Sequence, residues 1–272
     1  MIICPVCFHH CHLLEGQKGL CKARANHNEK MVSLSYGYVS SMALDPIEKK
    51  PLKRFYPGSY VLSIGSYGCN LRCPFCQNFE ISQEDLGGYL RYVSPKAIVD
   101  KAIELKKNGN IGIAFTYNEP LCSFEFVRDV SKLAKSAGLK TVLVSNGTAS
   151  QEVLLEILPF IDAMNIDLKG SSSSFYEWVG GNFEETKSFI VTSAKTSHVE
   201  LTTLVIPGKN DSLDLMEEEA KWIASISKDI PLHLTRYFPI FNCNIEQTPL
   251  KTLQKLKEVA QKYLSYVYLG NV

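Results

Sequence analysis

The stretch "GCNLRCPFCQN", Gly68 to Asn78, holds three cysteines, Cys69, Cys73 and Cys76, with gaps of three and then two residues. Three thiols so close together suit a metal centre that one loop wraps. Structural zinc normally takes four protein ligands, and no histidine lies nearby in the sequence. A four-iron cluster prefers thiolate ligands, and three cysteines would leave one iron free to bind another molecule.

The composition is that of a large globular domain with room for a small appendage: 272 residues, 45% hydrophobic and 21% charged. A net charge of +1 gives no reason to expect nucleic acid or an anionic membrane as a partner. No segment approaches the ~20 apolar residues of a membrane span, and the N-terminus does not resemble a signal peptide. We therefore expect a cytoplasmic protein whose nine cysteines are metal ligands or catalytic groups rather than disulfides. The basic run Glu48–Arg54 is interpreted as a solvated linker.

From about Val61 onward, short β-branched runs alternate with helical patterns, which predicts an α/β fold with a parallel sheet. We expect strands over 60–67, 111–117, 140–145, 162–168, 198–206, 231–238 and 266–272, and helices over 94–110, 121–138, 150–160, 182–196, 213–227 and 249–263. Six or seven such units form a complete or partial barrel, or an open sheet. We place a cysteine-rich cap at residues 1–58 and the barrel domain at residues 59–272.

Polar clusters follow several of these predicted strands. Asn118 and Glu119 follow the second strand, Ser145 and Asn146 end the third, and Asp167 and Lys169 follow the fourth. Functional residues of such folds gather at the carboxyl ends of the strands, so we expect these side chains to lie near the cysteine loop.

The loop Cys69-x-x-x-Cys73-x-x-Cys76, with Phe75 before the last cysteine, resembles the signature of radical S-adenosylmethionine (SAM) enzymes. The resemblance implies a partial (β/α)6 TIM-like barrel and a [4Fe-4S] cluster whose open iron binds SAM. It also implies reductive cleavage of SAM to methionine and a 5′-deoxyadenosyl radical, which abstracts hydrogen from a substrate. A flavodoxin- or ferredoxin-type protein would supply the electron, under anaerobic conditions.

The same resemblance assigns roles at the strand ends. Asn118 and Glu119 match the position that holds the ammonium group of SAM, and Ser145 and Asn146 match the position that meets its ribose or carboxylate. Asp167 and Lys169 match an Asp-x-Lys pair of glycyl-radical-enzyme activases, and Phe75 would lie against the adenine. The alternatives are a surface acid for Glu119, a solvent-facing ion pair for Asp167 and Lys169, and core packing for Phe75.

Two groups within this family compete. The blocks "TYNEP", "SNG", "DLK" and "VIPG" resemble pyruvate formate-lyase activating enzymes, which generate a glycyl radical on a partner protein, although Val144 stands where those enzymes carry an acidic residue. The segments "DPIEKKPLKRFYPGS", "HLTRYFP" and "YVYLGNV" resemble the radical enzyme of the AmmeMemoRadiSam system, whose reaction is not settled. The substrate, a protein or a small molecule, is therefore left open. A non-catalytic iron–sulfur electron carrier or zinc scaffold is the alternative from another class.

Four further cysteines, Cys4, Cys7, Cys11 and Cys21, have gaps of two, three and nine residues. Four thiols suffice to close a zinc site or to ligate an auxiliary iron–sulfur cluster, and we expect a metal there because the N-terminal segment has few apolar residues. Histidines 9, 10 and 12 could replace one thiol. No role is assigned to Cys122 or Cys243, and His233, Arg236 and Tyr237 are interpreted either as facing the substrate or as packed in a strand.

Overall fold

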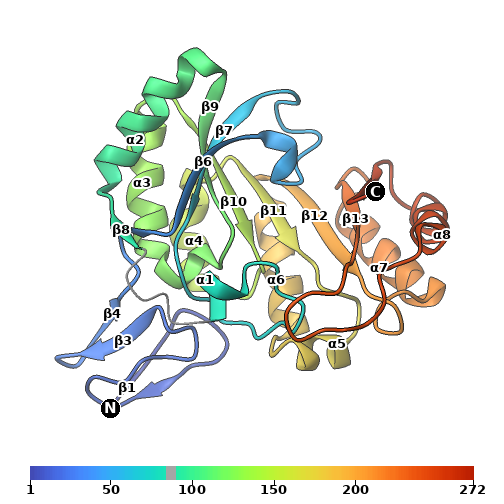
Figure 1. Ribbon diagram of the computed structural model, residues 1–272, viewed down its shortest axis with the longest axis horizontal. Helices are drawn as coiled ribbons and strands as arrows, with labels where there is room; N and C mark the ends of the chain where they lie inside the picture. Colours follow the sequence, from blue (N-terminus) through green and yellow to red (C-terminus); the bar gives the residue numbers. More distant parts are fainter. Residues whose placement is uncertain (84–89) are drawn as a thin grey trace.

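The computed structural model describes residues 1–83 and 90–272 (Figure 1). Over these residues, the main sheet has eight strands in the order β14-β13-β12-β11-β10-β9-β7-β6. From β7 to β14 all neighbours are parallel, and β6 pairs with β7 antiparallel. The strands are β6 (Ser41–Pro46), β7 (Tyr60–Gly65), β9 (Asn110–Phe115), β10 (Lys140–Ser145), β11 (Ala163–Asp167), β12 (His198–Val205), β13 (Leu232–Arg236) and β14 (Val267–Gly270).

Helices follow the parallel strands and cover one face of the curved sheet (Figure 1). They are α2 (Pro95–Glu104), α3 (Phe124–Ser136), α4 (Gln151–Ile157), α6 (Phe183–Ser193), α7 (Leu213–Ile226) and α8 (Leu250–Ala260). Their starts follow the predicted chemistry: the Ser94 side chain accepts a hydrogen bond from the Ala97 amide, and Pro95 stands at the first helical position. The predicted α/β class and the alternation are confirmed, because helices alternate with the parallel strands β7 to β14 along the chain and β9 to β11 are almost wholly buried.

Two short helices were not predicted. They are α1 (Phe79–Gln83), directly after the cysteine loop, and α5 (Ser173–Trp178), between β11 and α6. Neither is long enough to show a helical period in the sequence, and isolated helices of this length are unstable without tertiary packing.

The sheet is an open barrel. Its edge strands are β6 and β14, and within the described residues these two strands do not pair with each other. Among the helices of the described residues, none is both long and apolar enough to cross a bilayer.

The N-terminal segment forms two small antiparallel pairs, β1 (Ile2–Ile3) with β2 (His12–Leu13) and β3 (Arg24–His27) with β4 (Lys30–Ser33). It lies at the carboxyl ends of the barrel strands (Figure 1). There the Ser150 amide donates to the Val6 carbonyl at 2.9 Å. A further strand, β5 (Tyr38–Val39), pairs with β8 (Arg91–Tyr92). The domain boundary at residue 58 stays a prediction. Because β6 pairs with β7 and so belongs to the main sheet, the structure favours a boundary near residue 40.

The interpretation of Glu48–Arg54 as a solvated linker is wrong. This segment closes the opposite end of the barrel from the N-terminal segment (Figure 1), with Leu52 fully buried and Lys50 only 2% exposed. The Lys50 ammonium pairs with Asp45 at 3.0 Å. Buried charges of this kind are paired, and the sequence pattern alone does not reveal a partner.

Glu200 holds this closing segment from inside the barrel. Its fully buried carboxylate accepts hydrogen bonds from the Lys53 and Arg54 amides, at 2.9 and 2.7 Å. It also accepts bonds from the His198 and His233 rings, at 2.9 and 2.6 Å. Burial by itself raises the pKa of Glu200, but these four bonds outweigh it and lower the pKa to about 2. Because His233 lies at this end, it does not face a substrate at the carboxyl ends of the strands.

We expect Glu200→Ala to lower the free energy of unfolding by about 3–5 kcal/mol, because it leaves the buried His233 ring and three part-buried donors without their acceptor. The folded-state pKa lies below the ordinary value of about 4.3, so this stabilisation is present above that pH and is lost as the pH falls toward 2. Urea unfolding of both proteins from pH 7 to pH 3 measures the difference, which should shrink below about pH 4. Glu258→Ala, on the exposed face of α8, is the matched control with a change below about 0.5 kcal/mol. Equal stability of Glu200→Ala and the wild type would contradict this account.

Candidate functional site: a cysteine loop at the carboxyl ends of the strands

The cysteine loop begins at Gly68, three residues after the end of β7, and is held partly by its own backbone. The Leu71 amide points at the Cys69 sulfur at 3.4 Å, and the Cys76 amide donates to the Cys73 carbonyl at 3.3 Å. All three cysteines are free thiols. The loop therefore presents three unpaired sulfurs within one turn of chain, a donor set that suits an iron–sulfur cluster.

An apolar cluster surrounds these thiols on one side. Leu71 and Phe75 pack there with Phe175 and Val179 from α5 and its C-terminal cap, and with Tyr237 directly after β13. The Phe75 ring is 4% exposed, and its centroid lies 5.3 Å from that of Trp178. The ring is thus largely used in packing, and its contact with an adenine stays a prediction. The apolar side excludes water, which strengthens electrostatic interactions at the thiols.

The electrostatic surroundings of the thiols come from two strand ends. Burial is the main cause that raises the pKa of Cys69, and the Glu119 carboxylate raises it further. Burial also raises the pKa of Cys73 to about 11, while Lys169 opposes that rise. Glu119 follows β9 and Lys169 follows β11, so residues far apart in sequence face one loop.

Glu119 is buried at the end of β9, with 4% of its surface exposed. Its carboxylate accepts hydrogen bonds from the Leu121 amide at 3.0 Å, the Ser145 hydroxyl at 3.0 Å and the Asn146 amide at 2.8 Å. Burial raises the pKa of Glu119 to about 7 despite these three donors, which lower it. The alternative of a surface acid is therefore wrong for this residue.

Asn146 connects the end of β10 to the cysteine loop. Its side-chain amide donates to the Asn70 side chain at 2.9 Å and lies 3.7 Å from the Cys69 sulfur. Asn70 in turn donates to the Thr148 hydroxyl at 2.8 Å. Asn70 and Thr148 were missed by sequence reasoning, although the place of Asn70 inside the cysteine loop is a signal that could have pointed to it. Hydrogen bonds to sulfur of this kind help to set the potential of a cluster.

Asp167 and Lys169 form an ion pair of 2.7 Å at the end of β11. Lys169 is the more buried partner, with 16% of its side chain exposed. Burial opposes its charge, but Asp167 and the thiols of Cys73 and Cys76 raise the pKa of Lys169 above its ordinary value. The pair therefore faces the cysteine loop rather than only solvent.

Asn118 joins the start of the cysteine loop to the end of β9. Its side-chain oxygen accepts from the Ser66 amide at 3.0 Å, and its side-chain nitrogen donates to the Gly68 carbonyl at 3.0 Å. Both bonds join the Asn118 side-chain amide to the backbone at the start of the cysteine loop, so the structure favours a positioning role for Asn118. Direct contact of Asn118 with a cofactor stays a prediction.

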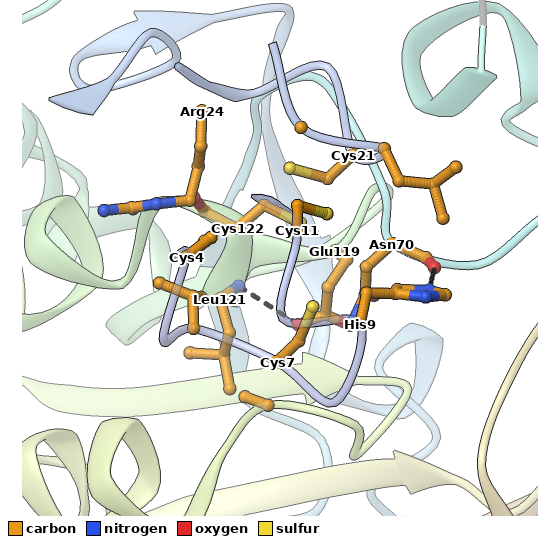
Figure 2. A pocket seen from close by; sticks show the side chains of 14 residues that line it. Cys4, Cys7, His9, Cys11, Cys21, Arg24, Asn70, Glu119, Leu121 and Cys122 are labelled. Carbon is orange, nitrogen blue, oxygen red and sulfur yellow. Dashed lines mark hydrogen bonds between the residues drawn. The ribbon is translucent and has the colours of Figure 1, made fainter. Parts of the chain in front are cut away.

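The four N-terminal cysteines line one cavity at the edge of this site (Figure 2). Glu119 and Asn70 line the same cavity, and so does Cys122, which follows Glu119 by three residues. No sequence signal joined Cys122 to cysteines about a hundred residues away. Within residues 1–83 and 90–272, no group of three or more His, Cys, Asp or Glu side chains is arranged to hold a metal ion. A four-iron cluster does not require that compact arrangement, because its own iron and sulfide atoms occupy the space between the thiolates.

The other late-strand candidates lie in packed surroundings. Tyr237 is 1% exposed, and its hydroxyl donates to the Cys243 carbonyl at 2.7 Å. The Arg236 guanidinium donates to the Thr248 carbonyl at 2.8 Å. For both residues, the interpretation as packed parts of a strand and its following loop is the better one.

Comparison with known proteins agrees with this geometry. Residues 63–219 match the family model described as the radical SAM superfamily. The chain is 37% identical to the uncharacterised protein MJ0808 of Methanocaldococcus jannaschii, over 99% of this chain and 81% of that protein. It is 26% identical to a putative glycyl-radical enzyme activating enzyme, MJ1632, of the same organism, over 76% of this chain and 79% of that protein.

A solved structure shares the fold. A domain of a pyruvate-formate lyase-activating enzyme from Bacteroides vulgatus superposes with a TM-score of 0.53 at 20% identity. The match covers 59% of this chain and 99% of that one. At this identity the likeness concerns the fold alone.

We expect Asn118→Ala to loosen the start of the cysteine loop, because the Ser66 amide loses its acceptor and the Gly68 carbonyl keeps only the Glu119 amide, at 3.3 Å. The expected cost is about 1–3 kcal/mol of unfolding free energy, together with faster hydrogen exchange of the Ser66 amide. Exchange mass spectrometry on peptides that span β7 and the loop measures this. Asn108→Ala, at an exposed position before β9, is the control and should leave exchange unchanged. Unaltered exchange at Ser66 in Asn118→Ala would refute the positioning role.

Proposed function

Because the chain belongs to the radical SAM superfamily, we propose that Cys69, Cys73 and Cys76 ligate its [4Fe-4S] cluster and that SAM binds beside them. The cluster, when bound and reduced, supplies the electron that cleaves SAM to methionine and a 5′-deoxyadenosyl radical, which abstracts hydrogen from the substrate. One observation carries the proposal: side chains from the ends of β9, β10 and β11 converge on the cysteine loop that follows β7.

Each of these side chains has a physical task in the proposal. Glu119 offers a buried carboxylate to the ammonium group of SAM, because a charge-assisted hydrogen bond is strongest where water is excluded. Asn146 orients the Cys69 sulfur, and Ser145 holds the Glu119 carboxylate in place. The Asp167–Lys169 pair supplies a fixed positive charge beside Cys73 and Cys76, which offsets the negative charge of a cluster.

For the substrate we propose a segment of a partner protein. The barrel is open between β6 and β14 over the described residues, and an open barrel admits a polypeptide loop more readily than a closed one. A relative named as a putative glycyl-radical enzyme activating enzyme supports the same class of substrate. A flavodoxin- or ferredoxin-type protein is the proposed electron donor. The resemblance to the AmmeMemoRadiSam radical enzyme leaves the product open.

We expect the anaerobically reconstituted protein, given dithionite and SAM, to release 5′-deoxyadenosine, measured by liquid chromatography and mass spectrometry. The triple variant Cys69→Ser, Cys73→Ser, Cys76→Ser should fall to the background of a reaction without enzyme. Cys243→Ala is the matched control for the loss of a thiol and should keep turning over SAM. Wild-type protein with intact cluster absorbance but no 5′-deoxyadenosine would overturn the proposed function.

We expect Glu119→Gln to weaken SAM binding by about 10- to 100-fold, because a hydrogen bond to a charged acceptor contributes about 1.5–3 kcal/mol. Equilibrium binding to protein with a full cluster measures the change, with iron content as the check that the cluster is intact. Glu152→Gln, on the exposed start of α4, removes a carboxylate from the surface and should bind SAM as the wild type does. Equal affinity of Glu119→Gln and the wild type would exclude Glu119 as the ammonium acceptor.

A further inference from the structure

Cys4, Cys7, Cys11 and Cys21 line one cavity (Figure 2), and the three thiols of the cysteine loop are not part of its lining. We propose that these four cysteines ligate a second iron–sulfur cluster, of the [4Fe-4S] type, which fastens the N-terminal segment to the carboxyl ends of the barrel strands. The cavity shares Glu119 with the proposed SAM site, but its four thiols are not those of the cysteine loop.

The four thiols are free and turned inward. Cys4 and Cys21 are only 6% and 8% exposed, although they belong to a short segment with little regular structure. The Cys4 amide donates to the Cys11 carbonyl at 2.9 Å, which brings two of the four into one backbone turn. Four thiols around one cavity in so small a module suit a metal centre that compensates for a small core.

The spacing of the thiols favours a cluster over a single zinc ion. Within residues 1–83 and 90–272, no three His, Cys, Asp or Glu side chains come close enough together to hold one metal ion. Zinc–sulfur bonds of about 2.3 Å require such a compact set. In a four-iron cluster the irons and sulfides lie between the ligands, so the four thiolates stay farther apart.

A buried positive charge accompanies the thiols. Arg24 also lines the cavity, is 3% exposed, and pairs with Glu125 at 2.7 Å. Its Nε–H is buried and has no hydrogen-bond partner among the described residues. A buried donor without an acceptor is costly, and an anionic cluster would satisfy both the donor and the charge.

Cys122 links this site to the barrel. Its buried side chain packs with Cys21 and Ala23, and its carbonyl accepts a hydrogen bond from Arg24 Nη1 at 3.1 Å. Cys122 lies in the short helix η3 (Pro120–Ser123), which begins directly after Glu119. We therefore assign Cys122 as a positioning residue and the other four as ligands.

The cysteine loop and the N-terminal segment also touch directly. Gly68 has a φ of +84°, and a Cβ at this position would lie 2.5 Å from the Cys21 carbonyl oxygen. Only glycine fits both the left-handed backbone and this approach. The second cluster is thus fixed against the same loop that holds the first three thiols.

The test compares iron and sulfide content after anaerobic reconstitution. We expect about eight irons per chain in the wild type, about four in the triple serine variant of Cys69, Cys73 and Cys76, and about four in Cys7→Ser/Cys11→Ser. In the triple variant the remaining cluster has four cysteine ligands and no open iron. Its electron paramagnetic resonance spectrum should therefore not change when SAM is added, whereas that of Cys7→Ser/Cys11→Ser should change.

Cys243→Ala is the control that removes a cysteine outside the cavity and should keep about eight irons. An iron-free triple variant that still folds by circular dichroism would overturn the proposal. So would one zinc per chain that disappears in Cys7→Ser/Cys11→Ser, since this result assigns the site to zinc. The triple variant retains the four N-terminal cysteines, so its iron content decides the matter even if Cys7→Ser/Cys11→Ser fails to fold. A failure of SAM cleavage leaves these metal counts unaffected, so the two proposals are tested independently.

Discussion

The Glu119 carboxylate joins the ends of two neighbouring parallel strands, and the rest of the site is arranged around it. It follows β9, yet it accepts hydrogen bonds from Ser145 and Asn146 at the end of β10. Parallel pairing of β9 with β10 makes this contact available, because it brings the carboxyl ends of both strands to one edge. A carboxylate held in this way is a pre-organised acceptor. Little further rearrangement is needed when it binds a cation.

Around this carboxylate the chain provides two contrasting walls. Apolar side chains, including Phe75 and Tyr237, cover one side of the cysteine loop, while Asn146 and the Asp167–Lys169 pair approach it from the strand ends. The N-terminal segment covers a further part of the site and contacts the loop at Gly68. Radical chemistry benefits from such enclosure, because exclusion of water prevents side reactions of reactive intermediates.

The opposite end of the barrel serves stability. Glu200 gathers two histidines and two backbone amides there, and it holds the segment that looked like a solvated linker. The charged residues of Glu48–Arg54 led us to expect an exposed segment. In the folded chain, however, Lys50 is buried against Asp45, and Glu200 binds the backbone of Lys53 and Arg54 rather than their side chains. A residue pattern does not show which backbone amides donate hydrogen bonds to a buried carboxylate.

The amino-acid sequence by itself determined the alternation of strands and helices, the radical SAM assignment, and the choice of Glu119, Asn146 and Lys169 as residues near the cysteine loop. Each rests on short-range information: a hydrophobic period, a cysteine spacing, or a polar residue where a parallel strand ends. The tertiary structure alone decided the binding of the Lys53 and Arg54 amides by Glu200, the place of His233 beside Glu200, and the meeting of Cys122 with four cysteines from the other end of the chain. These contacts join residues more than thirty positions apart, and side chains so distant meet only through packing that no local pattern encodes.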